Sequence, residues 1–305
     1  MGHIITDLKE AFRRGNVYIQ LIFINVGVFV ITTLIGILLQ LFNRSAAGIF
    51  ELLALPASFT RFAWQPWSIF TYMFMHAGFL HILFNMLWLY WFGALFLYFF
   101  SGKHLRGLYI VGGICGGLLY MISYNVFPYF RPMTAYSTMV GASASVLAIV
   151  VATAYREPNY PVRLLFFGNV RLKYLALIVV LTDLLFITSS NAGGHIAHLG
   201  GALAGLWFAA SLNKGKDITS WVNKALDAIA ALFSAKTWKR KPKMKVHYGN
   251  NTRQNDYDYN ARKKAQSDEI DRILDKLKKS GYESLTSEEK KSLVDARKRE
   301  HREQI

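Results

Sequence analysis

Apolar residues gather in six long stretches along the first two thirds of the chain, and short polar segments separate them. The stretches cover residues 17–42, 77–100, 105–124, 138–155, 172–189 and 195–212. A helix needs about 20 consecutive apolar residues to cross the hydrocarbon core of a bilayer. The run from 69 to 100 is too long for one crossing, so the polar break at 76–78 sets the start of its helix near residue 77. The pattern therefore predicts an all-α, polytopic membrane protein built on a six-helix transmembrane bundle.

Basic residues lie in alternate loops, and this asymmetry predicts the orientation of the bundle. The basic side carries Lys9, Arg13, Arg14, Lys103, Arg106, Arg156, Arg163, Arg171, Lys173, Lys214 and Lys216. On the other side, 189–194 has no Lys or Arg and 125–137 has only Arg131. Cytoplasmic loops carry the excess of Lys and Arg. We therefore expect a multi-pass protein of the cell (inner) membrane with its N- and C-termini in the cytoplasm.

The segment between the first two stretches, 43–76, is long and rich in aromatic residues. These residues are Phe50, Phe59, Phe62, Trp64 and Trp67. Loops of this length are rarely structureless, and aromatic side chains favour the headgroup level of a membrane. We expect an amphipathic segment partly sunk in the outer interface, with an ordinary extracellular loop as the alternative.

Charged residues are concentrated after residue 212. Residues 1–212 hold 12 Lys and Arg with 5 Asp and Glu, whereas the remainder holds 23 and 14. This contrast indicates a membrane-embedded part followed by a water-exposed part. The net charge of +16 has a simpler cause than nucleic acid, because positive loops between apolar spans contribute to it. The expected partner is the lipid bilayer, and no nucleic acid is expected.

The chain divides into four predicted parts: a cytosolic N-terminal segment (1–16), a six-span core (17–212), a basic amphipathic segment with a linker (213–266) and a small helical-hairpin motif (267–305). Within the third part, 224–245 begins amphipathic and ends basic, as a segment on an anionic inner leaflet would. A solvated linker is an equal alternative there. Residues 248–260 have the composition of a linker.

The hairpin motif has recognisable helix signals. One helix face is formed by Ile270, Ile273, Leu274 and Leu277. Gly281 suits the end of the first helix, and Thr286 with Glu289 forms a capping box for the second. A module that binds a cytosolic partner is the generic expectation for this tail.

Polar residues inside membrane spans are costly and are candidates for function. Those in or next to the spans are His76, His81, Asn85, Ser143, Asp183, His195 and His198. At 1.5 Å per residue, Ser143 lies about 8 Å from the outer end of its stretch, His198 about 5 Å, His81 about 6 Å and Asn85 about 12 Å. Four groups from three helices are therefore predicted to share one outer layer.

Spacing within the helices brings these groups closer together. His81 and Asn85 are four residues apart, on one face of a helix. Gly201 and Gly205 form a GxxxG step, which lets helix backbones approach closely in lipid. Such an approach would bring the Ser143 hydroxyl near an imidazole, which a serine needs as a base to act as a nucleophile. Donors from Asn85, His81 and the Ser143 backbone N–H could then hold an oxyanion.

Three sequence blocks carry a resemblance to a known family. They are "HAGFLHILFN" (76–85), "GASA" (141–144) and "AHLGGALAG" (197–205). Together they resemble the HxxxxHxxxN, GxSx and AHxxGxxxG motifs of bacterial rhomboid intramembrane serine proteases, in the right order, over roughly 17–212. The tail looks like a short C-terminal motif found on some of these proteins.

The resemblance implies a rhomboid-like bundle and a serine-type endopeptidase without a cofactor or metal. It implies Ser143 as nucleophile, His198 as general base, and Asn85 and His81 as oxyanion-side residues, supported by Gly141. The implied substrates are transmembrane proteins, cut near the outer membrane face. His195 and His76 are the runner-up site residues.

Two positions depart from the family pattern, and one acidic residue needs an explanation. Ala144 replaces a frequent Gly, and Leu147 replaces an aromatic residue that commonly stacks on the histidine. Asp183 could complete a Ser-His-Asp triad, but the family implies a Ser-His dyad. We therefore expect Asp183 to serve helix packing by hydrogen bonding.

Two other functions fit parts of the pattern. A metal-dependent membrane protease or transporter could use His76, His81, His195 and His198, since zinc accepts imidazoles. However, the chain has no HExxH, which such a protease would favour. A non-catalytic rhomboid-like scaffold that binds membrane helices is the other alternative.

Overall fold

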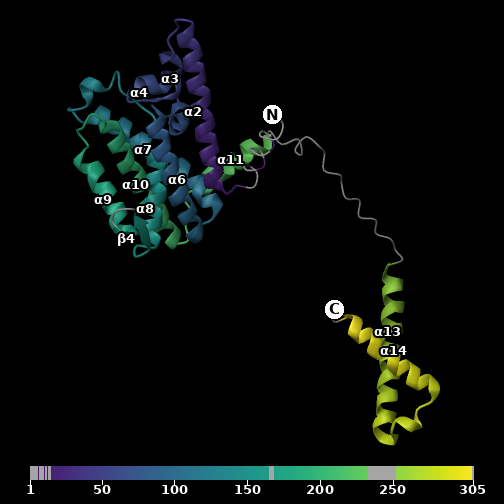
Figure 1. Ribbon diagram of the computed structural model, residues 1–305. Coiled ribbons are helices and arrows are strands. Elements are labelled where there is room, and N and C mark those ends of the chain that lie inside the picture. The colour runs from purple at the N-terminus through teal and green to yellow at the C-terminus, as the bar shows by residue number, and fades with distance from the viewer. Residues whose placement is uncertain are drawn as a thin grey trace. The chain divides into compact units, whose positions relative to one another are not determined.

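Figure 1 shows the computed structural model of the chain, which describes residues 6, 10, 12, 15–164, 168–232 and 252–303. The chain forms two compact units, Met1–Trp238 and Lys239–Ile305. The predicted N-terminal charges Lys9, Arg13 and Arg14, and the basic residues 233–245, lie outside the described residues.

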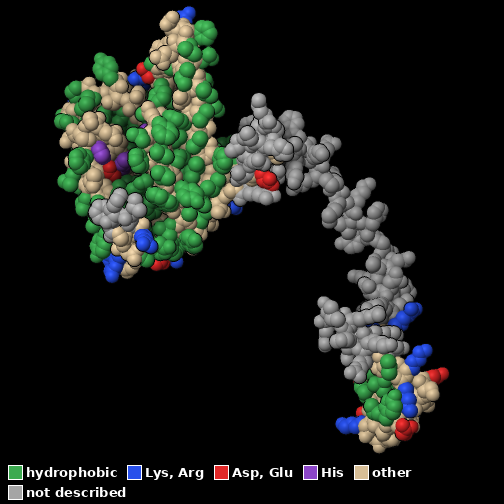
Figure 2. All heavy atoms as spheres, viewed as in Figure 1, with side chains coloured by type: hydrophobic (Ala, Val, Ile, Leu, Met, Phe, Trp, Pro, Cys, Tyr) green, Lys and Arg blue, Asp and Glu red, His purple; other side chains and the backbone are tan. Residues whose placement is uncertain are grey.

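Six helices of the first unit occupy the predicted apolar stretches. They are α2 (Val17–Leu41), α6 (Phe79–Phe99), α7 (Gly102–Val126), α8 (Ser143–Arg156), α9 (Leu172–Leu185) and α10 (Ala192–Asn213). Of these, α2, α6, α7 and α10 are long and apolar enough to cross a membrane. Hydrophobic side chains cover most of the face of this unit shown in Figure 2. The expectation of a polytopic helical membrane bundle is confirmed.

Two of the predicted spans are shorter than expected. The stretch 138–155 begins with strand β2 (Thr138–Met139), which pairs with β1 (Leu55–Pro56). After β2, Gly141 has a φ of +132°, which is incompatible with a helix, so α8 starts only at Ser143. At the other end, α9 stops at Leu185, where the polar sequence that follows favours turns. Both α8 and α9 have 14 residues, or about 21 Å, less than the hydrocarbon thickness.

Helix α8 is the centre of the bundle. Residues 144–154 of α8 are all buried, and α6, α7, α9 and α10 pack around it. The GxxxG step of α10 allows the closest of these approaches. A Cβ added to Gly201 or Gly205 would collide with the carbonyl oxygen of Ala144 or Ala148. The predicted close approach of α8 and α10 is therefore present, and it sets the spacing of their side chains.

The long segment before α6 is ordered by short elements. It contains α3 (Ala47–Leu53), β1, α4 (Phe59–Trp64), α5 (Ser68–Thr71) and the 3-10 helix η1 (Tyr72–Phe74). The Tyr109 hydroxyl of α7 donates to the Met73 carbonyl at 3.0 Å, which ties the segment to the bundle. Trp64 and Trp67 are exposed. Exposed aromatic residues agree with an interfacial position, which stays a prediction.

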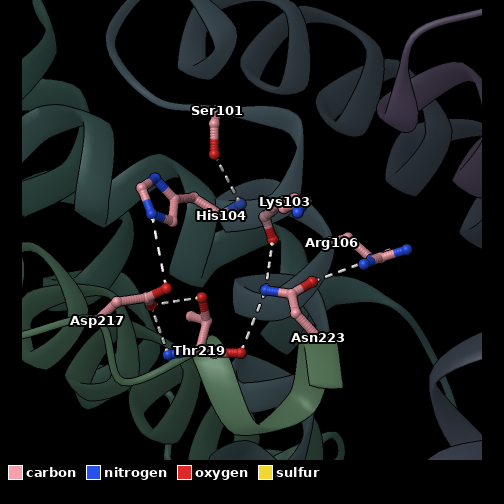
Figure 3. Close-up of polar contacts among 7 residues, drawn as sticks. All are labelled: Ser101, Lys103, His104, Arg106, Asp217, Thr219 and Asn223. Carbon is pink, nitrogen blue, oxygen red and sulfur yellow. Dashed lines mark hydrogen bonds and ion pairs between the residues drawn. The ribbon is translucent and has the colours of Figure 1, made fainter. Parts of the chain in front are cut away.

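Helix α11 (Ser220–Leu232) is fastened to the start of α7 by a polar network (Figure 3). Arg106 donates to the Asn223 side-chain oxygen at 3.0 Å, and the Asn223 amide donates to the Lys103 carbonyl at 3.0 Å. Asp217 lies 3.7 Å from His104 and accepts from the Thr219 backbone N–H at 2.7 Å. A hairpin of β3 (Pro161–Leu164) and β4 (Gly168–Arg171) joins α8 to α9.

The second unit is a helical hairpin of α13 (Thr252–Ser280), η3 (Tyr282–Ser284) and α14 (Ser287–Glu303). The capping box is present, because the Thr286 N–H donates to the Glu289 carboxylate at 2.8 Å and the Glu289 N–H donates to the Thr286 hydroxyl at 3.3 Å. Gly281 ends α13 with a φ of +75°. Helix α13 begins within the stretch 248–260 that was expected to be a linker, and no Gly or Pro interrupts it before Gly281. Residues 248–251 lie outside the described part.

Candidate active site

Ser143 is the first residue of α8, and the loop before it is held in one conformation. The Gly141 N–H donates to the Tyr72 carbonyl at 2.9 Å. Gly141 has a positive φ, and an added Cβ would lie 2.9 Å from the His81 ring. Only glycine suits this position. The loop thus places the Ser143 side chain next to His81. Helix α8 begins at Ser143, later than the predicted start at residue 138.

The N-terminus of α8 supplies free donors beside Ser143. The first backbone bond of the helix runs from the Val146 N–H to the Ala142 carbonyl. The N–H groups of the first turn have no partner within a helix, and the positive end of the helix dipole lies there. A negative charge that develops on a group next to Ser143 would be stabilised by both.

Helix α6 contributes a polar face to the same region. Asn85 is buried, and one N–H of its amide donates to the His81 carbonyl at 2.8 Å. An amide has a second N–H, which this bond leaves available. His76 precedes α6 and packs edge-on against His81, with ring centroids 5.2 Å apart. Burial, followed by the nearby His81, lowers the pKa of His76 to about 4, so this ring is neutral at physiological pH.

Asp183 contacts two histidines. Contact with His198 is the arrangement that the triad alternative required, whereas contact with His195 was not anticipated. Its Oδ1 lies 2.8 Å from Nδ1 of His195 and 2.8 Å from Nδ1 of His198. The Asp183 side chain is only 5 % exposed, and its Oδ2 has no hydrogen-bond partner among the described residues. Figure 2 shows histidine beside acidic side chains on this face of the bundle. These bonds join α9 to α10, as the expected role in helix packing by hydrogen bonding requires, and they also place the carboxylate directly against both imidazoles.

Two cavities meet at Ser143, Asn85 and His198, which line both of them. The smaller, of about 200 Å³, is apolar and is completed by Phe84, Trp88, Val146, Leu147 and Val179. The larger, of about 530 Å³, is more polar. His81 lines the larger cavity, whereas neither His195 nor His76 is among the residues lining the two. Serine, imidazole and amide groups from three helices therefore share one solvent-accessible space.

Sequence reasoning missed several residues that line the larger cavity. Tyr120 and Tyr124 of α7, Ser137 of the loop before β2, and Asn191 before α10 all contribute to its wall. The spacing of Tyr120 and Tyr124 places them on one helix face, and this signal could have singled them out. The contribution of Ser137 depends on the pairing of β1 with β2, which no local pattern shows.

The histidines separate into two groups, and one of them could hold a metal. Donor atoms of Asp183, His195 and His198 lie within 4.8 Å of one another, whereas His76 and His81 form a separate pair. A tetrahedral zinc ion about 2.0–2.1 Å from each donor would hold the donors about 3.3 Å apart. The observed 2.8 Å between Oδ1 and each Nδ1 fits hydrogen bonds better.

The fold and this site define an integral membrane protein with a serine, a histidine and an asparagine around one cavity. Residues 63–214 match the Rhomboid domain family model, and residues 254–299 match a Family of unknown function (DUF6576). The chain is 29% identical over 158 residues to "RHOMBOID-like protein 12, mitochondrial" of Arabidopsis thaliana. That match covers 49% of this chain and 47% of the relative, so the chain spans about half the length of the curated relative it matches. The chain belongs to the rhomboid family.

Proposed function

We propose that the chain is an intramembrane serine endopeptidase that cleaves transmembrane proteins with Ser143 and His198. The observation that carries this proposal is the shared cavity, where Ser143 of α8, His198 of α10 and Asn85 of α6 meet. Membership of the rhomboid family supports it. A serine needs an adjacent base to act as a nucleophile, and His198 is the imidazole that lines both cavities with it.

The chemistry follows from the groups present. His198 Nε2 takes the proton of the Ser143 hydroxyl while Oγ attacks the substrate carbonyl carbon. The resulting oxyanion accepts hydrogen bonds from the first-turn N–H groups of α8 and from the free amide N–H of Asn85, with His81 beside them. The imidazolium then gives its proton to the leaving amine, and the acyl-enzyme forms. Water, activated by the same imidazole, hydrolyses the ester and restores Ser143.

The position of the site suggests where substrates are cut. Lys103 and Arg106 lie at the start of α7, directly after α6, and Arg163 and Arg171 lie in the hairpin after α8. These basic residues follow the ends of α6 and α8 that are remote from Asn85 and Ser143. Under the positive-inside rule, the termini are cytoplasmic and the site lies toward the outer face of the cell (inner) membrane. The substrates are transmembrane proteins held in the lipid bilayer. We also propose that the C-terminal hairpin binds a cytosolic partner.

The decisive experiment compares two neighbouring serines. Ser145 is two residues from Ser143, is buried, and its hydroxyl has no hydrogen-bond partner among the described residues. Purified protein in proteoliposomes would be assayed with a model transmembrane substrate. Ser143→Ala should abolish cleavage, whereas Ser145→Ala should retain it. Cleavage by Ser143→Ala at the wild-type rate would refute the serine mechanism.

A metal-dependent function is the second candidate, because Asp183, His195 and His198 offer three donors within 4.8 Å of one another. Zinc catalysis would be sensitive to a chelator and would survive loss of the Ser143 hydroxyl. Treatment with 1,10-phenanthroline should leave cleavage unchanged if Ser143 is the nucleophile. A non-catalytic scaffold, the third candidate, would bind transmembrane helices without cleaving them.

A further inference from the structure

The His198 ring has one hydrogen-bond partner in the described part of the chain, and it is Asp183. The carboxylate comes from the last turn of α9, and the imidazole from the second turn of α10. Oδ1 lies 2.8 Å from Nδ1, which is the length of a charge-assisted hydrogen bond. Leu147, which faces the same cavity, has no polar group to offer. Among the described residues, this is therefore the one hydrogen bond that orients the ring.

The chemistry of a carboxylate determines which ring nitrogen carries the proton. An ionised carboxylate can only accept hydrogen bonds. Each Nδ1 that contacts Oδ1 must then be a donor, so the neutral His198 ring leaves Nε2 without a proton. Nε2 is the nitrogen that must accept the hydroxyl proton if Ser143 is to attack. Asp183 thus favours the one tautomer of His198 that can act as a base.

His195 gives the carboxylate a second fixed contact. It lies three residues before His198, so both rings are on one face of α10. Its Nδ1 is also 2.8 Å from Oδ1, and His195 is not among the residues lining either cavity. The two bonds use both lone pairs of Oδ1, which restricts rotation of the carboxylate. His195 is therefore placed to hold Asp183, and only Asp183 bonds to His198.

We propose that Asp183 is a positioning residue that holds His198 in its Nδ1–H tautomer, and that His195 secures the carboxylate. This inference rests on the proposed serine protease function. It differs from a packing role in one testable respect. A packing contact between α9 and α10 would affect stability, whereas a positioning contact affects the rate of the chemical step in a folded protein.

Asparagine is the informative replacement for Asp183. Asp183→Asn keeps size and hydrogen bonding, but its amide can donate to Nδ1 and so place the ring proton on Nε2, the wrong nitrogen. The expected effect is a decrease in kcat of about 10²–10⁴-fold with KM nearly unchanged. Asp183→Glu retains the carboxylate, and its kcat should be at least about tenfold higher than that of Asp183→Asn. His195→Gln keeps a donor and should lower kcat less than Asp183→Asn.

The matched control is Thr182→Ala. Thr182 is adjacent on α9, is exposed, and its hydroxyl bonds only to the Ile178 carbonyl of its own helix. The variants would be compared in proteoliposomes for kcat and KM, and in detergent for melting temperature. Selective ¹⁵N labelling of histidine, with His198→Gln for assignment, would report the tautomer directly. Thr182→Ala should match wild type in all of these measurements.

The outcomes separate this inference from the proposed function. If Ser143→Ala is inactive and Asp183→Asn retains wild-type kcat and the Nδ1–H tautomer of His198, the positioning role is refuted and the serine mechanism stands. If Asp183→Asn loses activity only in proportion to a lower melting temperature, and Asp183→Glu recovers none, Asp183 is a packing residue. If Ser143→Ala remains active, the proposed function itself fails. A lower kcat in folded Asp183→Asn, with the tautomer changed, supports the inference.

Discussion

Replacing Gly201 by alanine tests whether the close packing of α8 and α10 aligns the site. A Cβ on Gly201 would overlap the Ala144 carbonyl oxygen. Ala144 directly follows Ser143, and Gly201 lies one helical turn after His198. The three atoms nearest to that Cβ are all backbone atoms of Ala144, so no side chain can rotate to make room. The helices must separate locally, and the two catalytic candidates must separate with them.

The size of the effect follows from that overlap. Real Cβ atoms essentially never approach a neighbouring atom more closely than 3.0 Å, so α10 must move by about 1 Å. Overpacking a buried site typically costs about 1–3 kcal/mol of stability, and a misplacement of about 1 Å can cost about 10²-fold in rate. We therefore expect Gly201→Ala to remain folded with a lower melting temperature, and to lose about 10²-fold in kcat/KM.

The matched control is Gly27→Ala in α2, where an added Cβ meets nothing within 4 Å. This variant should keep full activity, and its stability should not fall, since alanine favours a helix. Both variants would be assayed on the same transmembrane substrate, alongside thermal unfolding in detergent. Wild-type kcat/KM in Gly201→Ala would refute the claim that this contact aligns Ser143 with His198.

Three further predictions concern the oxyanion, the orientation and the tail. Asn85→Ala should lower turnover by about 10²–10³-fold, the cost of one oxyanion donor, and wild-type turnover would place Asn85 outside the site. In a Cys115→Ala background, Ser190→Cys should react with an impermeant thiol reagent from outside the cell and Lys216→Cys should not; reversed labelling would contradict the orientation. The pKa of Glu289 is lowered, first by the hydrogen bond from the Thr286 backbone N–H and then by Lys276. The stability that the Glu289 carboxylate gives the hairpin is therefore fully present above its pKa in the unfolded chain, and it is lost as the pH falls through its pKa in the folded chain. Hydrogen exchange of α14 should therefore differ between wild type and Glu289→Gln at pH 7 and converge at low pH, and an equal difference at both pH values would exclude this linkage.

The sequence predicted the helices well because hydrophobic length is a local property. It misplaced the start of α8, since the β1–β2 pairing and the positive φ of Gly141 depend on segments far apart in the chain. It also did not show that 252–260 is helical, because polar composition alone does not distinguish a solvated helix from a loop.

The candidate site could be anticipated only in part. Shared depth and GxxxG spacing indicated that Ser143, His198 and Asn85 would meet, and the cavities show them together. The contact of Asp183 with His198 was considered only as a triad alternative, and its contact with His195 was not predicted, because α9 is apolar on nearly all sides and its sequence does not reveal which face turns toward α10. The family pattern of a dyad also argued against it.

The central claim is that Ser143 is a nucleophile activated by His198, and covalent labelling tests this most directly. An activated fluorophosphonate reacts with a serine hydroxyl only when a base assists it. Mass spectrometry of the labelled, folded wild-type protein should find the adduct on Ser143, with labelling lost in Ser143→Ala and strongly reduced in His198→Gln. Ser145→Ala should label as wild type does. An unlabelled wild-type protein, or equal labelling in Ser143→Ala, would contradict the account.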